Sequence, residues 1–171
     1  AFTAALADSG YVPERPLILL VNRENSFKCA IADYLAETWT SGGLPVEVQA
    51  LPWEEYAAAL ERGEFDIYYG EARLTADWDL SSLLIPGGAL NYGNWSNPDT
   101  SRLLEEFAAA ESREAAMQAL CAHLKEQMPI LPVGFKSISV LTQADVVEGI
   151  TPTATEPLYN LGECIIRLKE E

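Results

Sequence analysis

Residues 70–79 hold the side chains of this sequence that best suit recognition of a small molecule. They combine small residues with a carboxylate at Asp77 and an aromatic ring at Trp78. A carboxylate forms a charge-assisted hydrogen bond with an ammonium group, worth roughly 1.5–3 kcal/mol. The segment therefore favours a ligand that carries a positive amine beside an apolar body. By spacing alone, Asp77 or Asp79 could equally cap a short helix predicted at 80–84.

Groups that would catalyse a reaction are scarce in the sequence. His123 is the only histidine, and helical spacing places it on the solvent-facing flank of its helix. The chain has no HExxH pair and no phosphate-binding glycine loop. The three cysteines form no CxxC pair, and we expect them to be small core residues. We therefore predict that the protein is not an enzyme and has no cofactor and no metal site. The cysteines are Cys29, Cys121 and Cys164.

The charge of the chain limits its partners. Its 171 residues include 11 basic and 26 acidic side chains, which gives a formal net charge of −15. This excess disfavours nucleic acid or an anionic membrane as a partner and weakly favours cationic or zwitterionic ligands. The sequence has no run of 18 apolar residues and no signal-peptide pattern at its start. Because it begins with Ala1 rather than Met, we expect a mature product or a piece of a longer protein.

The elements that would position the Asp77 segment follow from hydrophobic periodicity. In the first 70 residues, helical patterns alternate with apolar runs of strand type. Each connection between strands contains a helix, so the strands are expected to be parallel. Ligands of open α/β sheets bind beyond the carboxyl ends of the strands, and residues 70–79 follow the third strand. The helices are predicted at 2–9, 25–40 and 53–62, and the strands at 16–21, 45–50 and 65–69.

The remainder of the chain has a different pattern. Residues 70–96 are rich in loop-forming residues, and loops of this length are commonly functional. Asn97 and Ser112 are predicted to cap two helices. Apolar runs predict further strands at 130–133 and 138–141.

Six short segments provide a more specific signal, because they occur in one order over nearly the whole chain. They are Ala4–Tyr11, Gly43–Val48, Trp53–Ile67, Ala76–Trp78, Asn91–Asp99 and Met128–Val133. Their order and spacing resemble the C-terminal part of the family 5 extracellular solute-binding proteins. These proteins are the oligopeptide, dipeptide and nickel receptors of ABC importers.

The resemblance implies an α/β fold, namely a periplasmic-binding-protein-like lobe of type II. Such a lobe has a mixed, mostly parallel sheet with helices on both faces. It also implies two parts, a ligand-binding lobe at 1–140 and a return segment at 141–171. In relatives the return segment packs on a first lobe, which this sequence lacks. Its apolar residues should then find another partner, so we expect 165–168 to be extended and partly buried, within the chain or in a homodimer.

The resemblance also implies the site. In peptide-binding relatives, the aspartate that corresponds to Asp77 holds the α-ammonium group of the peptide. Those relatives often have an aromatic residue three positions earlier, where this chain has Leu74. The predicted ligand-binding residues are Asp77, Trp78, Arg73, Asn91 and Tyr92.

The implied function is that of a substrate-binding component of an ABC importer, which binds peptides or similar solutes in a cleft between lobes. Its partners would be the permease subunits. The full-length protein would lie outside the cytoplasm, anchored to the cell envelope as a lipoprotein. The alternative is the solute-sensing domain of a cytosolic transcription regulator with the same fold. Three unpaired thiols fit the reducing cytosol of that alternative slightly better.

Overall fold

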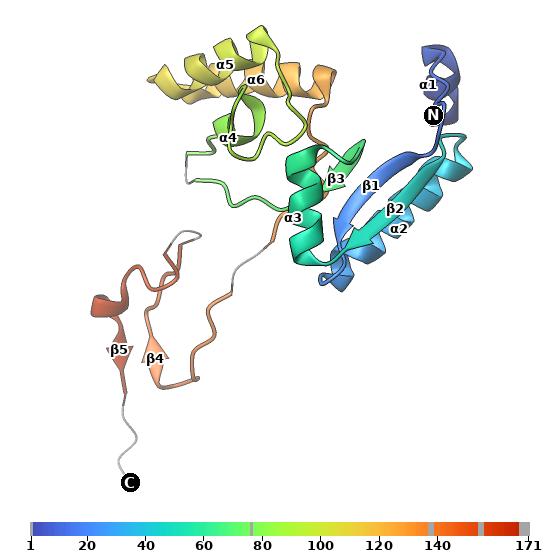
Figure 1. The fold of residues 1–171 in the computed structure, drawn as a ribbon. Helices are drawn as coiled ribbons and strands as arrows, with labels where there is room; N and C mark the ends of the chain where they lie inside the picture. The colour runs from blue at the N-terminus through green and yellow to red at the C-terminus, as the bar shows by residue number, and fades with distance from the viewer. Residues whose placement is uncertain (1, 76, 137–138, 154–155, 168–171) are drawn as a thin grey trace. The chain divides into compact units, whose positions relative to one another are not determined.

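The computed structural model describes residues 2–75, 77–136, 139–153 and 156–167, and the chain divides into two compact units (Figure 1). The first unit comprises Ala1–Arg73 and Tyr92–Asn94, and the second comprises Leu74–Asn91 and Trp95–Glu171. This division does not test the boundary predicted between residues 140 and 141, which stays a prediction.

A parallel sheet with the strand order β2–β1–β3 forms the centre of the first unit. β1 pairs with β2 along its whole length, and the middle of β1 pairs with β3. The predicted parallel arrangement is confirmed, so the carboxyl ends of all three strands lie at one edge. The strands are β1 (Leu17–Asn22), β2 (Val46–Leu51) and β3 (Ile67–Tyr69), and the helices of this unit are α1 (Phe2–Ser9), α2 (Ser26–Ser41) and α3 (Trp53–Arg62).

Helices cover both faces of this sheet. Leu19 and Val21 point to one face, where they pack on the buried Ala32 of α2. Leu20 points to the opposite face and packs on Tyr56 of α3. The alternation follows from the two-residue period of a strand, and β1 is central because it is apolar on both faces. The predicted α/β fold with helices on both faces is confirmed.

Local signals set the helix ends in this unit. Oδ1 of Asn25 accepts a hydrogen bond of 3.0 Å from the backbone N–H of Lys28 and so caps α2. Gly63 ends α3 with a φ of 68°, a conformation that costs glycine little. At the end of α2, a Cβ added to Gly42 would collide with the ring of Phe2. Glycine at that position therefore lets α1 pack closely on the end of α2.

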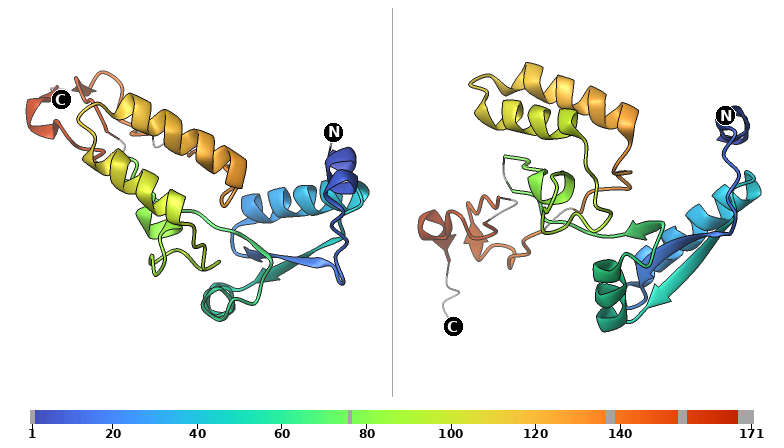
Figure 2. Two further views of the ribbon diagram at one scale, coloured as in Figure 1. Left: turned by 90° about the horizontal axis from the view of Figure 1, so that it is seen from above. Right: turned by 45° about the horizontal axis from the view of Figure 1, so that its top comes forward.

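Two helices that lie side by side form the main part of the second unit (Figure 2). Oδ1 of Asn97 accepts hydrogen bonds from two N–H groups of the first turn of α5, which confirms it as a cap. Ser112 precedes α6 as predicted, but its side chain makes no capping bond. None of the described helices is long and apolar enough to cross a bilayer. The helices are α4 (Ser81–Leu84), α5 (Pro98–Ala109) and α6 (Arg113–Gln127), and their buried core is Leu84, Leu103, Leu104, Phe107 and Leu120.

The strands predicted at 130–133 and 138–141 are wrong for the residues that the structure describes. Residues 130–133 and 139–141 have no strand pairing, and residue 138 lies outside the described residues. Pro129 and Pro132 lack the N–H groups that a strand ladder uses. An apolar run forms a strand only where another strand pairs with it, and no described strand lies beside this one.

The tail forms a small antiparallel hairpin, so its predicted extended conformation is confirmed. In it, β4 (Val147–Glu148) pairs with β5 (Ile165–Ile166), and the 3₁₀ helix η1 (Leu161–Glu163) precedes β5. The predicted burial within the chain is wrong, because Ile165 and Ile166 are 57% and 59% exposed. Two residue pairs bury too little surface to cover both side chains. Residue 168 lies outside the described residues, and burial in a homodimer stays a prediction.

Candidate functional site

Polar side chains hold the carboxyl edge of the parallel sheet together. Nζ of Lys28 on α2 lies 3.0 Å from Oε2 of Glu71, which follows β3. Oε1 of Glu24, which follows β1, accepts a hydrogen bond of 3.2 Å from the N–H of Trp53 at the start of α3. The loops that follow the three strands are therefore tied to α2 and α3. Sequence patterns singled out neither contact, because each joins segments far apart in the chain.

The predicted site residues are divided between the two units. Arg73 and Tyr92 belong to the first unit, whereas Asp77, Trp78 and Asn91 belong to the second. Arg73 is exposed at the end of the first unit's main segment.

Tyr92 packs in an aromatic cluster of the first unit. Its ring lies 5.9 Å from that of Tyr68, nearly perpendicular to it. The hydroxyl of the buried Tyr56 donates to the carbonyl of Tyr69 over 3.2 Å. Burial raises the pKa of Tyr56 to about 12, with smaller contributions from Tyr68 and Tyr92. Tyr92 is half-buried, so packing already uses much of its surface.

Thr75 organises the loop that carries Asp77. Its carbonyl accepts the N–H of Trp78 at 3.0 Å, and its hydroxyl oxygen accepts the N–H of Asp79 at 3.2 Å. The same hydroxyl bonds to the carboxylate of Asp77. These bonds hold Trp78 at a φ of 61°, which a bulky residue rarely adopts.

Asp77 presents an exposed carboxylate that favours its ionised form. The hydrogen bond from Thr75 lowers the pKa of Asp77, and a bond from its own backbone N–H and the charge of Arg113 act in the same direction. Asp79 instead bonds to the start of α4, because its Oδ1 accepts the N–H of Ser81 at 2.8 Å. Of the two aspartates considered for capping, Asp79 is therefore the one that bonds to α4, from the position before the N-cap residue Leu80.

Trp78 lies against the ring of Phe135, which is not among the predicted site residues. The centroids of Trp78 and Phe135 are 5.7 Å apart and their planes meet at 65°, an edge-to-face arrangement. Trp78 is 50% exposed and Phe135 is 77% exposed. The one sequence signal for Phe135 is its position, because it is an aromatic residue that follows shortly after the apolar segment 129–133.

Asn91 is buried, and its side-chain amide is fully engaged within its own loop. Nδ2 donates to the carbonyls of Ile85 and Trp95, each over 2.8 Å. Oδ1 accepts the N–H of Trp95, also at 2.8 Å. These bonds show how Asn91 holds the loop between α4 and α5.

The prediction that His123 faces solvent is wrong. The ring is half-buried between α5 and α6, and its Nε2 lies 2.8 Å from Oγ1 of Thr100. Thr100 is fully buried. The periodicity of its own helix predicted solvent exposure for His123, whereas its partner lies on the neighbouring helix.

The cysteines differ from the prediction of three core residues. Cys121 is exposed, whereas Cys29 and Cys164 are half-buried. Their Sγ atoms lie 3.5 Å and 3.4 Å from the backbone carbonyls of Asn22 and Asn160. Among the described residues, no three His, Cys, Asp or Glu side chains gather as metal ligands would.

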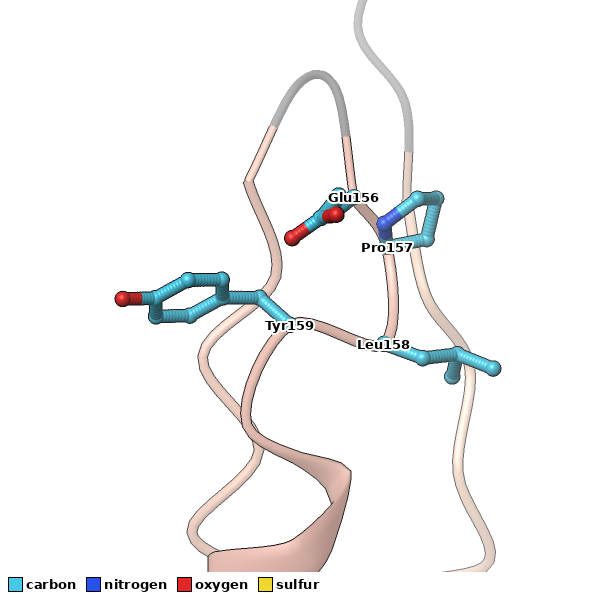
Figure 3. A pocket seen from close by; sticks show the side chains of 4 residues that line it. All are labelled: Glu156, Pro157, Leu158 and Tyr159. Atoms are coloured by element: carbon cyan, nitrogen blue, oxygen red, sulfur yellow. The ribbon is translucent and has the colours of Figure 1, made fainter.

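A separate open hollow lies on the tail (Figure 3). It is lined by four consecutive residues, 156–159, and Leu158 points away from Tyr159. None of the predicted site residues lines it, so it does not enter the candidate site.

Solved structures of substrate-binding proteins share the fold of this chain. The murein tripeptide-binding protein MppA of Escherichia coli matches with a TM-score of 0.64 and 25% identity, over 74% of this chain and 26% of MppA. An unliganded open form of MppA gives 28% identity, with a TM-score of 0.61 and the same coverage. The oligopeptide-binding protein AppA of Bacillus subtilis, in complex with a nonapeptide, matches over 97% of this chain and 37% of its own, with a TM-score of 0.68 and 15% identity. NikA of Staphylococcus aureus, in complex with Ni(L-His)2, matches over 74% of this chain and 29% of its own, with a TM-score of 0.61 and 17% identity.

These similarities have a defined extent. The chain covers only 26% to 37% of the length of the proteins that it resembles. No protein-family model and no curated protein matches the sequence. The similar structures are those of substrate-binding proteins rather than enzymes, which supports the prediction that this chain is not an enzyme.

Proposed function

Because the chain has the fold of one lobe of the family 5 solute-binding proteins, we propose that it forms part of the substrate-binding component of an ABC importer. Its solute would be a peptide or a similar small molecule with a positive amine. The observation that carries this proposal is the exposed carboxylate of Asp77, which accepts a hydrogen bond from the hydroxyl of Thr75 and directly precedes Trp78 in the chain. The net charge of −15 also favours a cationic or zwitterionic solute.

Each candidate residue has a distinct part in this proposal. Asp77 binds the ammonium group, and Trp78 packs against the adjacent apolar part of the solute. Arg73 and Tyr92 stay predicted ligand-binding residues. Asn91 acts indirectly by holding its loop, because all its polar atoms already have partners there.

The other features of the proposal concern the whole protein. The first lobe, which lies outside this sequence, would close on this one, bury the solute and present the closed form to the permease. Residues 141–171 would return to that first lobe, which gives the exposed Ile165 and Ile166 a partner. The protein would lie outside the cytoplasm, anchored to the cell envelope as a lipoprotein. If the chain occurs alone, a second copy would cover the tail instead and give a homodimer.

The rival function, a sensing domain of a cytosolic transcription regulator, is not favoured. The similar structures named above are those of substrate-binding proteins, and one of them is described as periplasmic. A helix-turn-helix domain encoded upstream of this chain would reverse that preference.

Calorimetry on the full-length protein tests the function through Asp77. We expect a tripeptide with a free amino group to bind, and the N-acetylated tripeptide to bind at least tenfold more weakly. Asp77→Asn should reduce the affinity for the free peptide by roughly 10-fold to 100-fold, since a charge-assisted bond is worth about 1.5–3 kcal/mol. The 171-residue chain alone should bind more weakly than about 1 mM, because it supplies one wall of the cleft.

Asp79→Asn is the matched control, since it removes the same charge two residues away. Asparagine can also accept the N–H of Ser81, so α4 keeps its bond. Equal loss of affinity in Asp77→Asn and Asp79→Asn would show that the change in net charge alone causes the effect. Unchanged affinity in Asp77→Asn would rule out Asp77 as the anchor.

A further inference from the structure

We propose that Trp78 and Phe135 form a subsite for an aromatic or large aliphatic group beside the amine that Asp77 binds. This inference rests on the function proposed above. The solutes of this subsite are peptides or other primary amines with a large apolar group on the carbon next to the nitrogen. Phe135 is thereby a specificity-determining residue.

The geometry of the two rings supports a binding surface. They meet edge to face with centroids 5.7 Å apart, so their contact leaves ring surface uncovered. The exposed fractions of 50% for Trp78 and 77% for Phe135 show that much of both rings meets solvent. Aromatic rings that keep this much exposed surface can gain from burying a ligand group.

The position of Trp78 supports a functional reason for that exposure. Its φ of 61° is unfavourable for a residue with a large side chain. Thr75 holds the backbone there, because its carbonyl and hydroxyl oxygens accept hydrogen bonds from the N–H groups of Trp78 and Asp79. Strained backbone of this kind concentrates at binding sites, and here it holds a half-exposed indole ring on the residue that follows Asp77.

The chemistry of an amino acid explains why anchor and subsite would be adjacent. The side chain of a peptide's first residue leaves the carbon that carries the ammonium group. A carboxylate that binds the ammonium must therefore have the side-chain pocket next to it. Asp77 is the immediate neighbour of Trp78, and Phe135 extends the apolar surface beyond it. The carboxylate complements the amine, and the rings complement the apolar group.

A peptide series on the full-length protein tests this assignment. We expect Phe-Ala-Ala to bind about tenfold more tightly than Gly-Ala-Ala, with Lys-Ala-Ala close to the glycine peptide. Phe135→Ala should remove most of that preference and leave the affinity for Gly-Ala-Ala within about twofold. Phe135→Tyr, which keeps the ring, should retain the preference. Phe27→Ala is the matched control, since Phe27 is an exposed phenylalanine on α2, 67% accessible.

The outcomes separate this inference from the function on which it rests. One outcome is that Asp77→Asn lowers the affinity while the wild type shows no preference for the first side chain. That outcome would overturn the subsite and leave the proposed function standing. If Phe135→Ala weakened the affinity for all peptides to the same extent, the subsite would also be overturned, because a specificity residue must act on one group. A preference for Lys-Ala-Ala would replace the apolar subsite with a cation site. No peptide binding by the wild type would overturn the function itself.

Discussion

Oγ1 of the fully buried Thr100 lies 2.8 Å from Nε2 of His123, and the pair joins α5 to α6. Nε1 of Trp95 lies 3.4 Å from the same oxygen. An indole nitrogen only donates, so the hydroxyl accepts from Trp95 and its own proton is available to the ring of His123. One buried hydroxyl therefore links two helices and the loop that precedes them.

Thr100→Val should destabilise the protein although the side chain keeps its shape. The substitution leaves Trp95 Nε1 and His123 Nε2 without their buried partner, at a cost of roughly 1–3 kcal/mol in the free energy of unfolding. Urea denaturation measures that cost. Thr38→Val is the control, because the exposed Thr38 hydroxyl donates only to the carbonyl of Tyr34 on its own helix. Equal stability of the two variants would show that the Thr100 hydroxyl contributes nothing.

The hydrogen bonds of Asp66 predict how the stability of the fold changes with pH. Its carboxylate accepts two hydrogen bonds from the Arg15 guanidinium, at 2.6 Å and 3.0 Å, and one from the N–H of Ile18 at 2.7 Å. The Arg15 bond, followed by the Ile18 bond, lowers the pKa of Asp66. A lowered folded-state pKa gives stability that is present above the unfolded pKa and is lost as pH falls through the folded one.

Asp66→Asn should therefore be less stable than the wild type near pH 7, and the difference should shrink as pH falls below the unfolded aspartate pKa of about 3.9. Urea midpoints over that range measure it. Asp33→Asn, an exposed position on α2, controls for the loss of one negative charge. A deficit that stays constant with pH would mean that the ionised carboxylate is not the stabilising group.

The first unit could be predicted from the sequence because its signals are local. The apolar run of β1, the cap at Asn25 and the glycine at Gly63 each specify an element within a few residues. The strand order β2–β1–β3 was not predicted; it agrees with burial, because β1 alone of these three strands has fully buried residues on both faces. The loop that carries Asp77 follows β3 as predicted, because the apolar run of β3 is also a local signal.

The remaining features depend on contacts between distant residues. His123 was assigned to solvent from the pattern of its own helix, whereas its partner Thr100 lies on another. Phe135 has only its place after the apolar segment 129–133 as a local signal, and its contact with Trp78 depends on the fold. The run 130–133 has strand-type residues but no strand to pair with. A single sequence specifies such contacts only through the complete fold.

Tyr56 should ionise well above an ordinary tyrosine. Its pKa is raised to about 12, mainly because burial disfavours the phenolate. Above the unfolded pKa of 10 the unfolded chain loses this proton first, so stability should fall between about pH 10 and 12. Difference ultraviolet titration of the wild type against Tyr56→Phe isolates this one ionisation. If the absorbance step that Tyr56→Phe removes were centred near pH 10, burial would not raise the pKa of Tyr56.

Removal of the Tyr56 hydroxyl also tests its bond to the Tyr69 carbonyl. Tyr56→Phe should lower the free energy of unfolding by about 1 kcal/mol at neutral pH. Tyr34→Phe on the exposed side of α2 should leave it within about 0.5 kcal/mol of the wild type. A stability gain in Tyr56→Phe would show that the hydroxyl is poorly satisfied.

The tail hairpin provides the last prediction. β4 and β5 join only two residue pairs, supported by the ion pair between Arg167 and Glu148 at 2.8 Å. A two-stranded hairpin with exposed side chains is marginally stable in water. Its amides should therefore open far more easily than those of β1, where Leu20 and Val21 are fully buried.

Hydrogen exchange at low protein concentration should show residues 165–167 exchanging at least a hundredfold faster than residues 19–21, since local opening of the hairpin costs little. Arg167→Ala removes the ion pair with Glu148 and should speed exchange in β5 without changing it in β1. The same measurement at rising concentration tests the homodimer. Protection of residues 165–167 that grows with concentration is expected if a second copy covers the exposed Ile165 and Ile166. Protection as strong as that of β1 at every dilution would contradict a marginal hairpin and show that the tail is held within its own chain.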